Sequence, residues 1–230
     1  MKNPIFLSLD LNSWDETHEL SELLKNEVGG FKVGPRLAMK ATSKDWQKLA
    51  DYGPVFYDPK YYDIPNTMLE SIKACVDLGI SYLTIHASSG LKAMTEIKKL
   101  ETEINQSHFF KILAVTALTS FGDDNPIPGF KGQNINSVVK DLAEMTLKSG
   151  LSGLVCSGEE VEAVSKMNKN LFTVVPGIRL QEDSKDDQKR VMTPNLAMSK
   201  GAKALVVGRP IILAQDPLKA AKQFSALCKS

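Results

Sequence analysis

The chain has 230 residues, 43% of them hydrophobic, and its 28 basic and 27 acidic residues leave a formal charge of +1. A chain of this size can bury the core of one large α/β domain, and it lacks the basic field of a nucleic-acid-binding protein. Its three cysteines lie far apart without metal-ligand spacing, which indicates reduced thiols and a cytoplasmic location. No apolar run approaches the roughly 18 residues of a membrane span, and Pro4–Leu9 is too short for the apolar part of a signal peptide.

Eight short apolar segments are typical of buried β-strands. In chain order they are Pro4–Asp10, Phe31–Gly34, Val55–Lys60, Tyr82–Ala87, Lys111–Leu118, Gly153–Ser157, Leu171–Gly177 and Ala204–Arg209. Helices are predicted between them, from Asn12 or Ser13 to about Val28, over Ala38–Tyr52 and Ile64–Leu78, after Gly90, from about Gly132 to Lys148, over Glu159–Met167, from Pro194, and over Pro217–Cys228.

Continuous apolar strands that alternate with helices every 25 to 30 residues or so indicate a closed parallel sheet. We therefore predict a single-domain (β/α)8 TIM barrel over residues 1–230. An open doubly wound sheet is the alternative. It is disfavoured because the first strand is not followed by a Gly-x-Gly-x-x-Gly turn and the chain has no Walker loop.

Polar and charged residues gather at the predicted carboxyl ends of the strands. They are Asp10, Lys32, Asp58, Lys60, His86, Thr119, Ser120, Arg179 and Arg209. Active sites of (β/α)8 barrels lie at this end of the strands, so these positions predict a catalytic mouth. Among the histidines, His86 is expected to be a hydrogen-bonded structural residue, and His18 is expected at the surface.

The third strand ends in the densest group of charges. Side chains alternate faces along a strand, so Asp58 and Lys60 are expected to point the same way and Pro59 the other way. A second carboxylate, Asp63, follows three residues later. Charges beside a core strand are costly to bury unless they pair or take part in chemistry. A structural ion pair at the strand-to-helix turn is the alternative interpretation.

The last two strand ends are typical of a phosphate site. Gly177 and Gly208 let backbone N–H groups approach an anion, and Arg209 offers a bidentate, charge-assisted contact. Strand-terminal glycines beside surface arginines are the alternative. The polar segment Gln181–Arg190 has no apolar period and is predicted to be a mobile lid, with a solvated loop as its alternative.

Residues along the whole chain resemble the orotidine 5'-phosphate decarboxylase family. The central match is Asp58-x-Lys60-x-x-Asp63-Ile64-Pro65-Asn66-Thr67. Matching segments in the same order are Leu9-Asp10, Phe31-Lys32-Val33-Gly34, Val115-Thr116-x-Leu118-Thr119-Ser120, Val155-Cys156-Ser157, Pro176-Gly177-Ile178-Arg179, Asp187-Gln188-x-Arg190-x-Met192-Thr193-Pro194 and Val207-Gly208-Arg209-Pro210. The chain resembles the bacterial, single-function form. It departs from the pattern at Pro59 and Tyr62, where the family usually has a bulky apolar residue and often histidine.

The resemblance implies a carboxy-lyase that converts orotidine 5'-monophosphate to UMP and CO2, the last step of de novo pyrimidine (UMP) biosynthesis. It implies no cofactor and no metal, a cytoplasmic homodimer with shared active sites, and neither nucleic acid nor membrane as partner. In this reaction Lys60 protonates C6 of the pyrimidine, Asp58 lies near the departing carboxylate, and Asp63 enters the neighbouring subunit's site.

The remaining roles also follow from the resemblance. Asp10 and Lys32 contact the ribose hydroxyls, as do the partner chain's residues around Ile64 and Thr67. Thr119 touches the base, with Ser120 as its neighbour. Arg179, Gly208 and Arg209 hold the phosphate, and Gln188 reaches the phosphate or the base from the closed lid.

Two other functions stay open. A related barrel decarboxylase acting on a keto-sugar phosphate with magnesium would need a further acidic ligand at a strand end, where strand two supplies Lys32 instead. A non-catalytic nucleotide-phosphate binding protein would not need Lys60.

Overall fold

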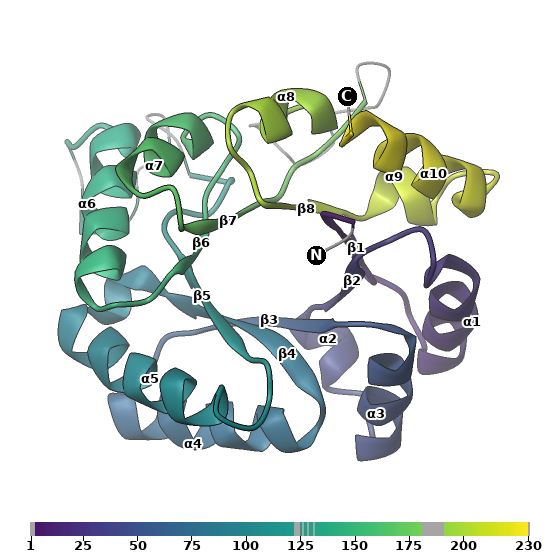
Figure 1. Ribbon diagram of the computed structural model, residues 1–230, viewed down its shortest axis with the longest axis horizontal. Coiled ribbons are helices and arrows are strands. Elements are labelled where there is room, and N and C mark those ends of the chain that lie inside the picture. Colours follow the sequence, from purple (N-terminus) through teal and green to yellow (C-terminus); the bar gives the residue numbers. More distant parts are fainter. Residues whose placement is uncertain are drawn as a thin grey trace.

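The computed structural model describes residues 3–121, 125, 127, 129–130, 132–180 and 191–229. In these residues, eight parallel strands follow one another around a closed barrel in chain order, and β8 pairs with β1 to close the ring (Figure 1). The predicted (β/α)8 barrel is therefore confirmed, and the alternative of an open sheet is wrong.

The strands are short and lie close to the predicted segments. They are β1 (Ile5–Ser8), β2 (Gly30–Val33), β3 (Val55–Tyr61), β4 (Ile80–His86), β5 (Lys111–Val115), β6 (Gly153–Val155), β7 (Phe172–Val175) and β8 (Ala204–Val207). The helices are α1 (Trp14–Leu24), α2 (Pro35–Ala38), α3 (Ser43–Tyr52), α4 (Pro65–Asp77), α5 (Leu91–Ile104), α6 (Ile135–Lys148), α7 (Val161–Met167), α8 (Pro194–Ser199), α9 (Arg209–Ile212) and α10 (Pro217–Leu227), with a 3-10 turn, η1 (Ala87–Ser89), after β4.

Large side chains fill the inside of the barrel beneath its mouth. The ring of Phe6 packs edge-on against Phe56 and Tyr82, with ring centroids 5.3 and 5.0 Å apart. Leu113, Val155 and other strand residues complete this inner cluster. A filled interior makes the barrel a rigid support for side chains at its carboxyl end rather than a pore.

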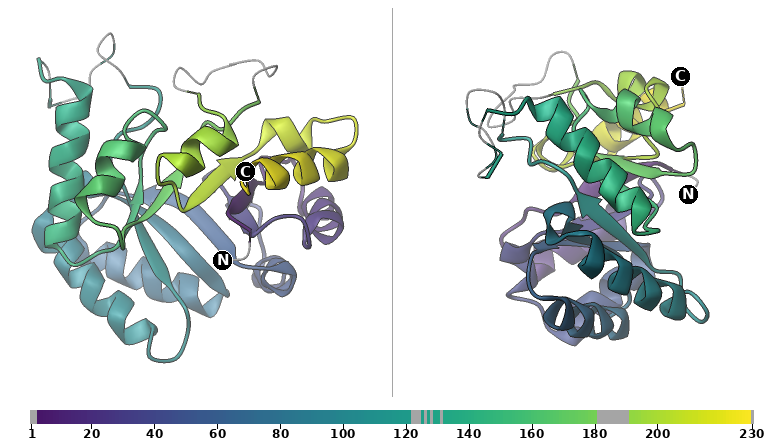
Figure 2. Two further views of the ribbon diagram at one scale, coloured as in Figure 1. Left: turned by 45° about the horizontal axis from the view of Figure 1, so that its top comes forward. Right: turned by 90° about the vertical axis from the view of Figure 1, so that its left-hand side faces the viewer.

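The helices cover the outside of the ring. Figure 2 shows this arrangement from two further directions, with α4 and α5 side by side over β4 and β5. The main core lies between this helical layer and the strands. None of the helices in the described residues is long and apolar enough to cross a lipid bilayer.

One predicted helix begins later than expected. The helix expected over Ala38–Tyr52 starts at Ser43 as α3, and Ala38 is instead the last residue of α2. The side chain of Thr42 accepts a hydrogen bond from the backbone of Asp45, whose carboxylate accepts one from the backbone of Thr42 in return. This capping box starts a new helix at Ser43.

Two placements differ from the sequence-based expectation. Arg209 does not end β8 but begins α9. His18 is buried rather than at the surface, because α1 packs against α3 and brings its imidazole Nε2 to 3.3 Å from Asp45 Oδ1.

Candidate active site

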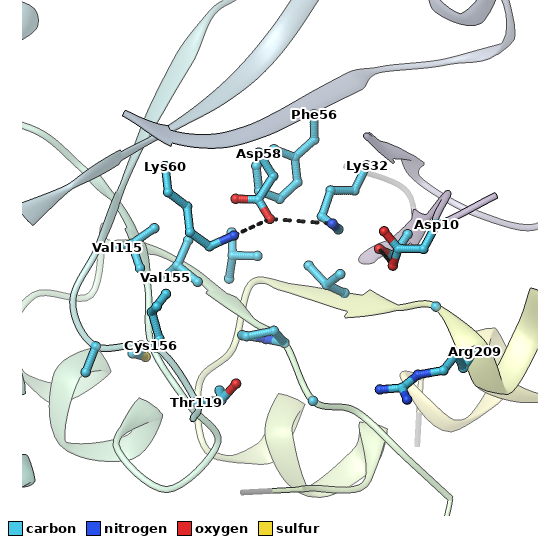
Figure 3. Close-up of a pocket in the computed structure, with 18 of the residues that line it drawn as sticks. Asp10, Lys32, Phe56, Asp58, Lys60, Val115, Thr119, Val155, Cys156 and Arg209 are labelled. Carbon is cyan, nitrogen blue, oxygen red and sulfur yellow. Dashed lines mark hydrogen bonds and ion pairs between the residues drawn. The ribbon is translucent and has the colours of Figure 1, made fainter. Parts of the chain in front are cut away.

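A pocket of about 230 Å³ opens at the carboxyl ends of the strands. It brings together eight of the residues predicted for the site, namely Asp10, Lys32, Asp58, Lys60, Thr119, Arg179, Gly208 and Arg209. In Figure 3 the charged residues of the first three strands lie along one side of this pocket, and Thr119 and Arg209 lie on the other. Its described lining carries four cationic side chains and two carboxylates, which favours an anionic ligand.

Asp58 stands at the centre of a charged cluster. Its Oδ2 atom lies 2.9 Å from Lys60 Nζ and 3.5 Å from Lys32 Nζ (Figure 3). The Asp58 and Lys32 side chains are 12% and 11% exposed, whereas that of Lys60 is 35% exposed. Asp58 and Lys32 are thus fixed in the wall, and the Lys60 ammonium is the member of this cluster most open to the pocket.

The backbone of β3 is irregular at this cluster. Tyr57 pairs with Leu83 of β4 and Tyr61 with Ile85, so three residues of β3 lie opposite Thr84 alone. Lys60 has φ of 52°, the one positive value among the described non-glycine residues. The prediction from regular alternation was therefore right that the Asp58 and Lys60 side chains meet, but wrong about the backbone that brings them together.

Thr84 is a site residue that sequence reasoning missed. It is fully buried on β4, and its hydroxyl donates a hydrogen bond of 2.8 Å to Asp58 Oδ1. The same hydroxyl accepts a hydrogen bond of 2.9 Å from the backbone N–H of Lys60. In the sequence Thr84 is an ordinary β-branched strand residue. It could have been identified only by noting that it lies on the next strand, opposite the Asp-x-Lys element of β3.

The other side of the mouth is built from β1, β7 and β8. Asp10 follows β1, and its Oδ2 accepts a hydrogen bond of 2.8 Å from the Ser8 hydroxyl. A Cβ atom at Gly208 would lie 3.1 Å from Ser8 Cβ, a tight contact, so glycine keeps this stretch of backbone open to the pocket. Gly177 has φ of 75°, a left-handed conformation that suits glycine, and turns the chain after β7 toward the buried Arg179.

His86 ends β4 close to the cluster. Burial lowers the pKa of its imidazole below the ordinary value, and the nearby positive charge of Lys60 lowers that pKa further, against a smaller opposite effect of Asp58. Its ring lies 5.9 Å from that of the exposed Tyr62. At neutral pH the side chain is therefore uncharged and adds no third cation beside Lys60 and Lys32.

Three predicted site residues lie outside this chain's own pocket. All three are exposed: Asp63 and Ile64 lie on the turn from β3 into α4, and Thr67 lies in the first turn of α4. None of them is among the described residues that line the cavity. Ile64 is 66% exposed and its neighbour Tyr62 is 68% exposed, which leaves an apolar surface around Asp63. Gln188 and the segment Gln181–Arg190, predicted as a lid, lie outside the described residues.

The residue types in the pocket favour ion pairing over metal binding. Within the described ranges, no three His, Cys, Asp or Glu side chains gather in a way that could hold a metal ion. Two ammonium groups already flank Asp58, and a divalent cation at that carboxylate would be repelled by both.

Comparisons with known proteins match the whole barrel. The family model described as "Orotidine 5'-phosphate decarboxylase / HUMPS family" matches residues 3–224. The chain is 40% identical to the orotidine 5'-phosphate decarboxylase of Novosphingobium aromaticivorans, over 98% of this chain and 99% of that protein. It is 36% identical to the protein of the same name from Dichelobacter nodosus, over 97% and 98% of the two chains. The crystal structure of orotidine 5'-phosphate decarboxylase from Lactobacillus acidophilus superposes with a TM-score of 0.85 at 31% identity, covering 99% of this chain and 100% of that one.

Proposed function

The chain belongs to the orotidine 5'-phosphate decarboxylase / HUMPS family, and on that premise we propose that it decarboxylates orotidine 5'-monophosphate to UMP and CO2. The observation that carries this proposal is the Lys60 ammonium, held 2.9 Å from Asp58 on one side of a pocket whose other side presents Arg209. The reaction is the last step of de novo pyrimidine biosynthesis. A cytoplasmic location is part of the proposal.

The chemistry requires a cation at C6 of the pyrimidine. Loss of CO2 leaves a carbanion whose lone pair lies in the ring plane, so the ring carbonyls cannot take up this charge by simple resonance. A preorganised ammonium stabilises the developing charge and then donates a proton to C6. Lys60 suits both tasks, because a lysine side chain is ordinarily charged at neutral pH and this one faces the pocket.

The other residues bind and orient the substrate. Asp10 and Lys32 line the same side of the pocket as Lys60 and supply an acceptor and a donor for the ribose hydroxyls. Thr119 contacts the base, and Arg179, Gly208 and Arg209 hold the phosphate. Binding energy from the phosphate, remote from C6, orders the charged cluster around the reacting atoms.

A homodimer completes the site in this proposal. Asp63, Ile64 and Thr67 are exposed and outside their own pocket, yet they lie within seven residues of Lys60 in the sequence. In a two-fold dimer such a turn can reach the pocket of the partner. The exposed apolar side chains of Tyr62 and Ile64 would be covered by that contact.

The proposal is tested by following the loss of orotidine 5'-monophosphate absorbance with purified protein. Because Lys60 is the proposed electrophile and proton donor, turnover should persist after exhaustive chelation with EDTA and without any organic cofactor. The control is the same assay with magnesium restored, which should change the rate by less than about twofold. Turnover that disappears in EDTA and returns with magnesium would instead place the chain among relatives that act on keto-sugar phosphates.

Arg209→Ala is expected to weaken catalysis through the phosphate. Arg209 begins α9 at the mouth and faces the cluster across the pocket (Figure 3). Removing a charge-assisted contact to a phosphate should cost about 2 to 4 kcal/mol of transition-state stabilisation, which is measured as a decrease in kcat/KM. Steady-state kinetics of the variant and the parent protein give this difference directly.

A truncated substrate provides the control for Arg209. Orotidine without its phosphate cannot use the arginine, so Arg209→Ala and the parent protein should turn it over at about the same low rate. A large defect of the variant on this truncated substrate would show that Arg209 acts elsewhere than at the phosphate.

A further inference from the structure

We propose that Thr84 is a positioning residue for the decarboxylation, one that fixes Asp58 and Lys60 relative to each other without touching the substrate. This inference rests on the proposed function for its kinetic part. Thr84 is fully buried on β4 and is not among the described residues that line the pocket. Its hydroxyl nevertheless contacts both members of the charged pair, one through its side chain and the other through its backbone.

The direction of the two hydrogen bonds is determined by the groups involved. A backbone N–H can only donate, so the Thr84 oxygen must accept from Lys60. The single hydroxyl proton is then available for Asp58 Oδ1, at 2.8 Å. The Thr84 oxygen on β4 thus forms hydrogen bonds with both the Asp58 carboxylate and the Lys60 backbone N–H on β3.

The Asp58 carboxylate is held at both of its oxygens. Oδ1 accepts from Thr84, while Oδ2 lies 2.9 Å from Lys60 Nζ and 3.5 Å from Lys32 Nζ. Without the hydroxyl, Oδ1 would lose this fixed donor and the carboxylate could turn about its side-chain bonds. The Lys60 ammonium, which this carboxylate orients, would then no longer be held in one position. A displacement of about 1 Å at a reacting group can cost about 100-fold in rate.

The same hydroxyl stabilises the irregular backbone of β3. Opposite Thr84, β3 holds three residues, of which Pro59 has no N–H to donate and Lys60 has φ of 52°. A left-handed conformation is unfavourable for a residue with Cβ and persists only where the surroundings hold it. The Thr84 hydroxyl accepts the hydrogen bond of the Lys60 N–H at this bulge, and so holds the backbone that carries the ammonium.

Thr84→Val removes the hydroxyl while keeping a β-branched side chain of similar size. We expect kcat for orotidine 5'-monophosphate to fall about 10- to 100-fold, because a buried N–H and a carboxylate oxygen each lose a partner. The affinity for UMP should stay within about threefold of the parent's, since no proposed substrate contact is removed. Thr84→Ser, which retains the hydroxyl, should restore kcat to within about threefold.

Thr173→Val is the matched control. Thr173 is also fully buried on a barrel strand, β7, but its hydroxyl donates to the backbone oxygen of Gly201, away from the pocket. Its loss should leave kcat within about twofold of the parent's even if the melting temperature falls. Thr84→Ser and Thr84→Ala, which differ by the hydroxyl alone, form a second pair in case valine prevents folding.

Amide hydrogen exchange tests the positioning independently of turnover. The Lys60 amide should be protected in the parent and in Thr84→Ser, and should exchange at least about tenfold faster in Thr84→Val and Thr84→Ala. A parent protein that does not decarboxylate orotidine 5'-monophosphate would reject the proposed function, and the exchange measurement would still decide whether Thr84 holds Lys60. Unchanged exchange, or an active parent whose kcat survives loss of the hydroxyl, would overturn the inference about Thr84.

Discussion

Lys60→Ala is expected to reduce turnover of orotidine 5'-monophosphate by roughly 10⁴-fold or more, which takes it below detection in an ordinary assay. The variant loses the proton donor to C6 and also the cation that stabilises the carbanion before protonation. Alanine keeps the Cβ atom, so the backbone at φ of 52° is no more strained than in the parent. The fold should therefore be retained, as circular dichroism and the melting temperature would show.

Two further variants make this result specific. Lys60→Arg keeps a positive charge but replaces the compact ammonium with a guanidinium that hardly gives up a proton, so it separates charge from proton donation. Lys111→Ala removes another half-buried lysine, at the start of β5, whose Nζ contacts Ser152 Oγ at 3.0 Å. Lys111→Ala should stay within about twofold of the parent. Near-normal turnover in Lys60→Ala would disprove the mechanism, because another group would then have to protonate C6.

The barrel and the composition of its mouth could be predicted from the sequence for a simple physical reason. A strand of a closed parallel sheet is covered on both faces, so it appears as a continuous apolar run that stops where the chain leaves the barrel. The first polar residues after such runs, such as Asp10, necessarily lie at the carboxyl end. Lys32, Asp58 and Arg209, also predicted at strand ends, line the same pocket, although Lys32 and Asp58 lie within β2 and β3 and Arg209 belongs to the following helix.

The bulge in β3 could not be predicted in this way. Regular alternation has a period of two and contains no information about where three residues of one strand face a single residue of the next. In our interpretation that arrangement depends on Thr84, which lies on a different strand. Nothing in the sequence distinguishes this threonine from other β-branched residues of buried strands. Pro59 was a partial signal, because proline within a sheet is confined to edges, strand starts and bulges.

The late start of α3, by contrast, could have been predicted from the sequence. Thr42 and Asp45 have the spacing of a capping box, so the start of a new helix at Ser43 could have been read from the sequence. The burial of His18 could not, because it depends on how α1 packs against α3. Local signals thus determine where helices begin, while burial of a single polar side chain is decided by tertiary contacts.

The position of Asp63 raises the question of which chain it serves. It lies three residues after Lys60, but it is exposed and absent from the described lining of its own pocket. If the turn crosses a two-fold interface, each site combines Lys60 of one chain with Asp63 of the other. Lys60→Ala and Asp63→Ala homodimers should then each be severely impaired, because in both variants neither of the two sites is complete.

Mixing these two inactive homodimers should restore activity. After dissociation and random reassociation of equal amounts, about half of the dimers are hybrids, and each hybrid has one intact site and one site that lacks both residues. Activity should rise toward roughly a quarter of the parental value per site. Subunit exchange is verified separately, for example with chains that carry two different fluorescent labels, and a mixture of Lys60→Ala with itself is the control. If the subunits exchange and activity does not rise, Asp63 acts in its own chain and the shared site is wrong.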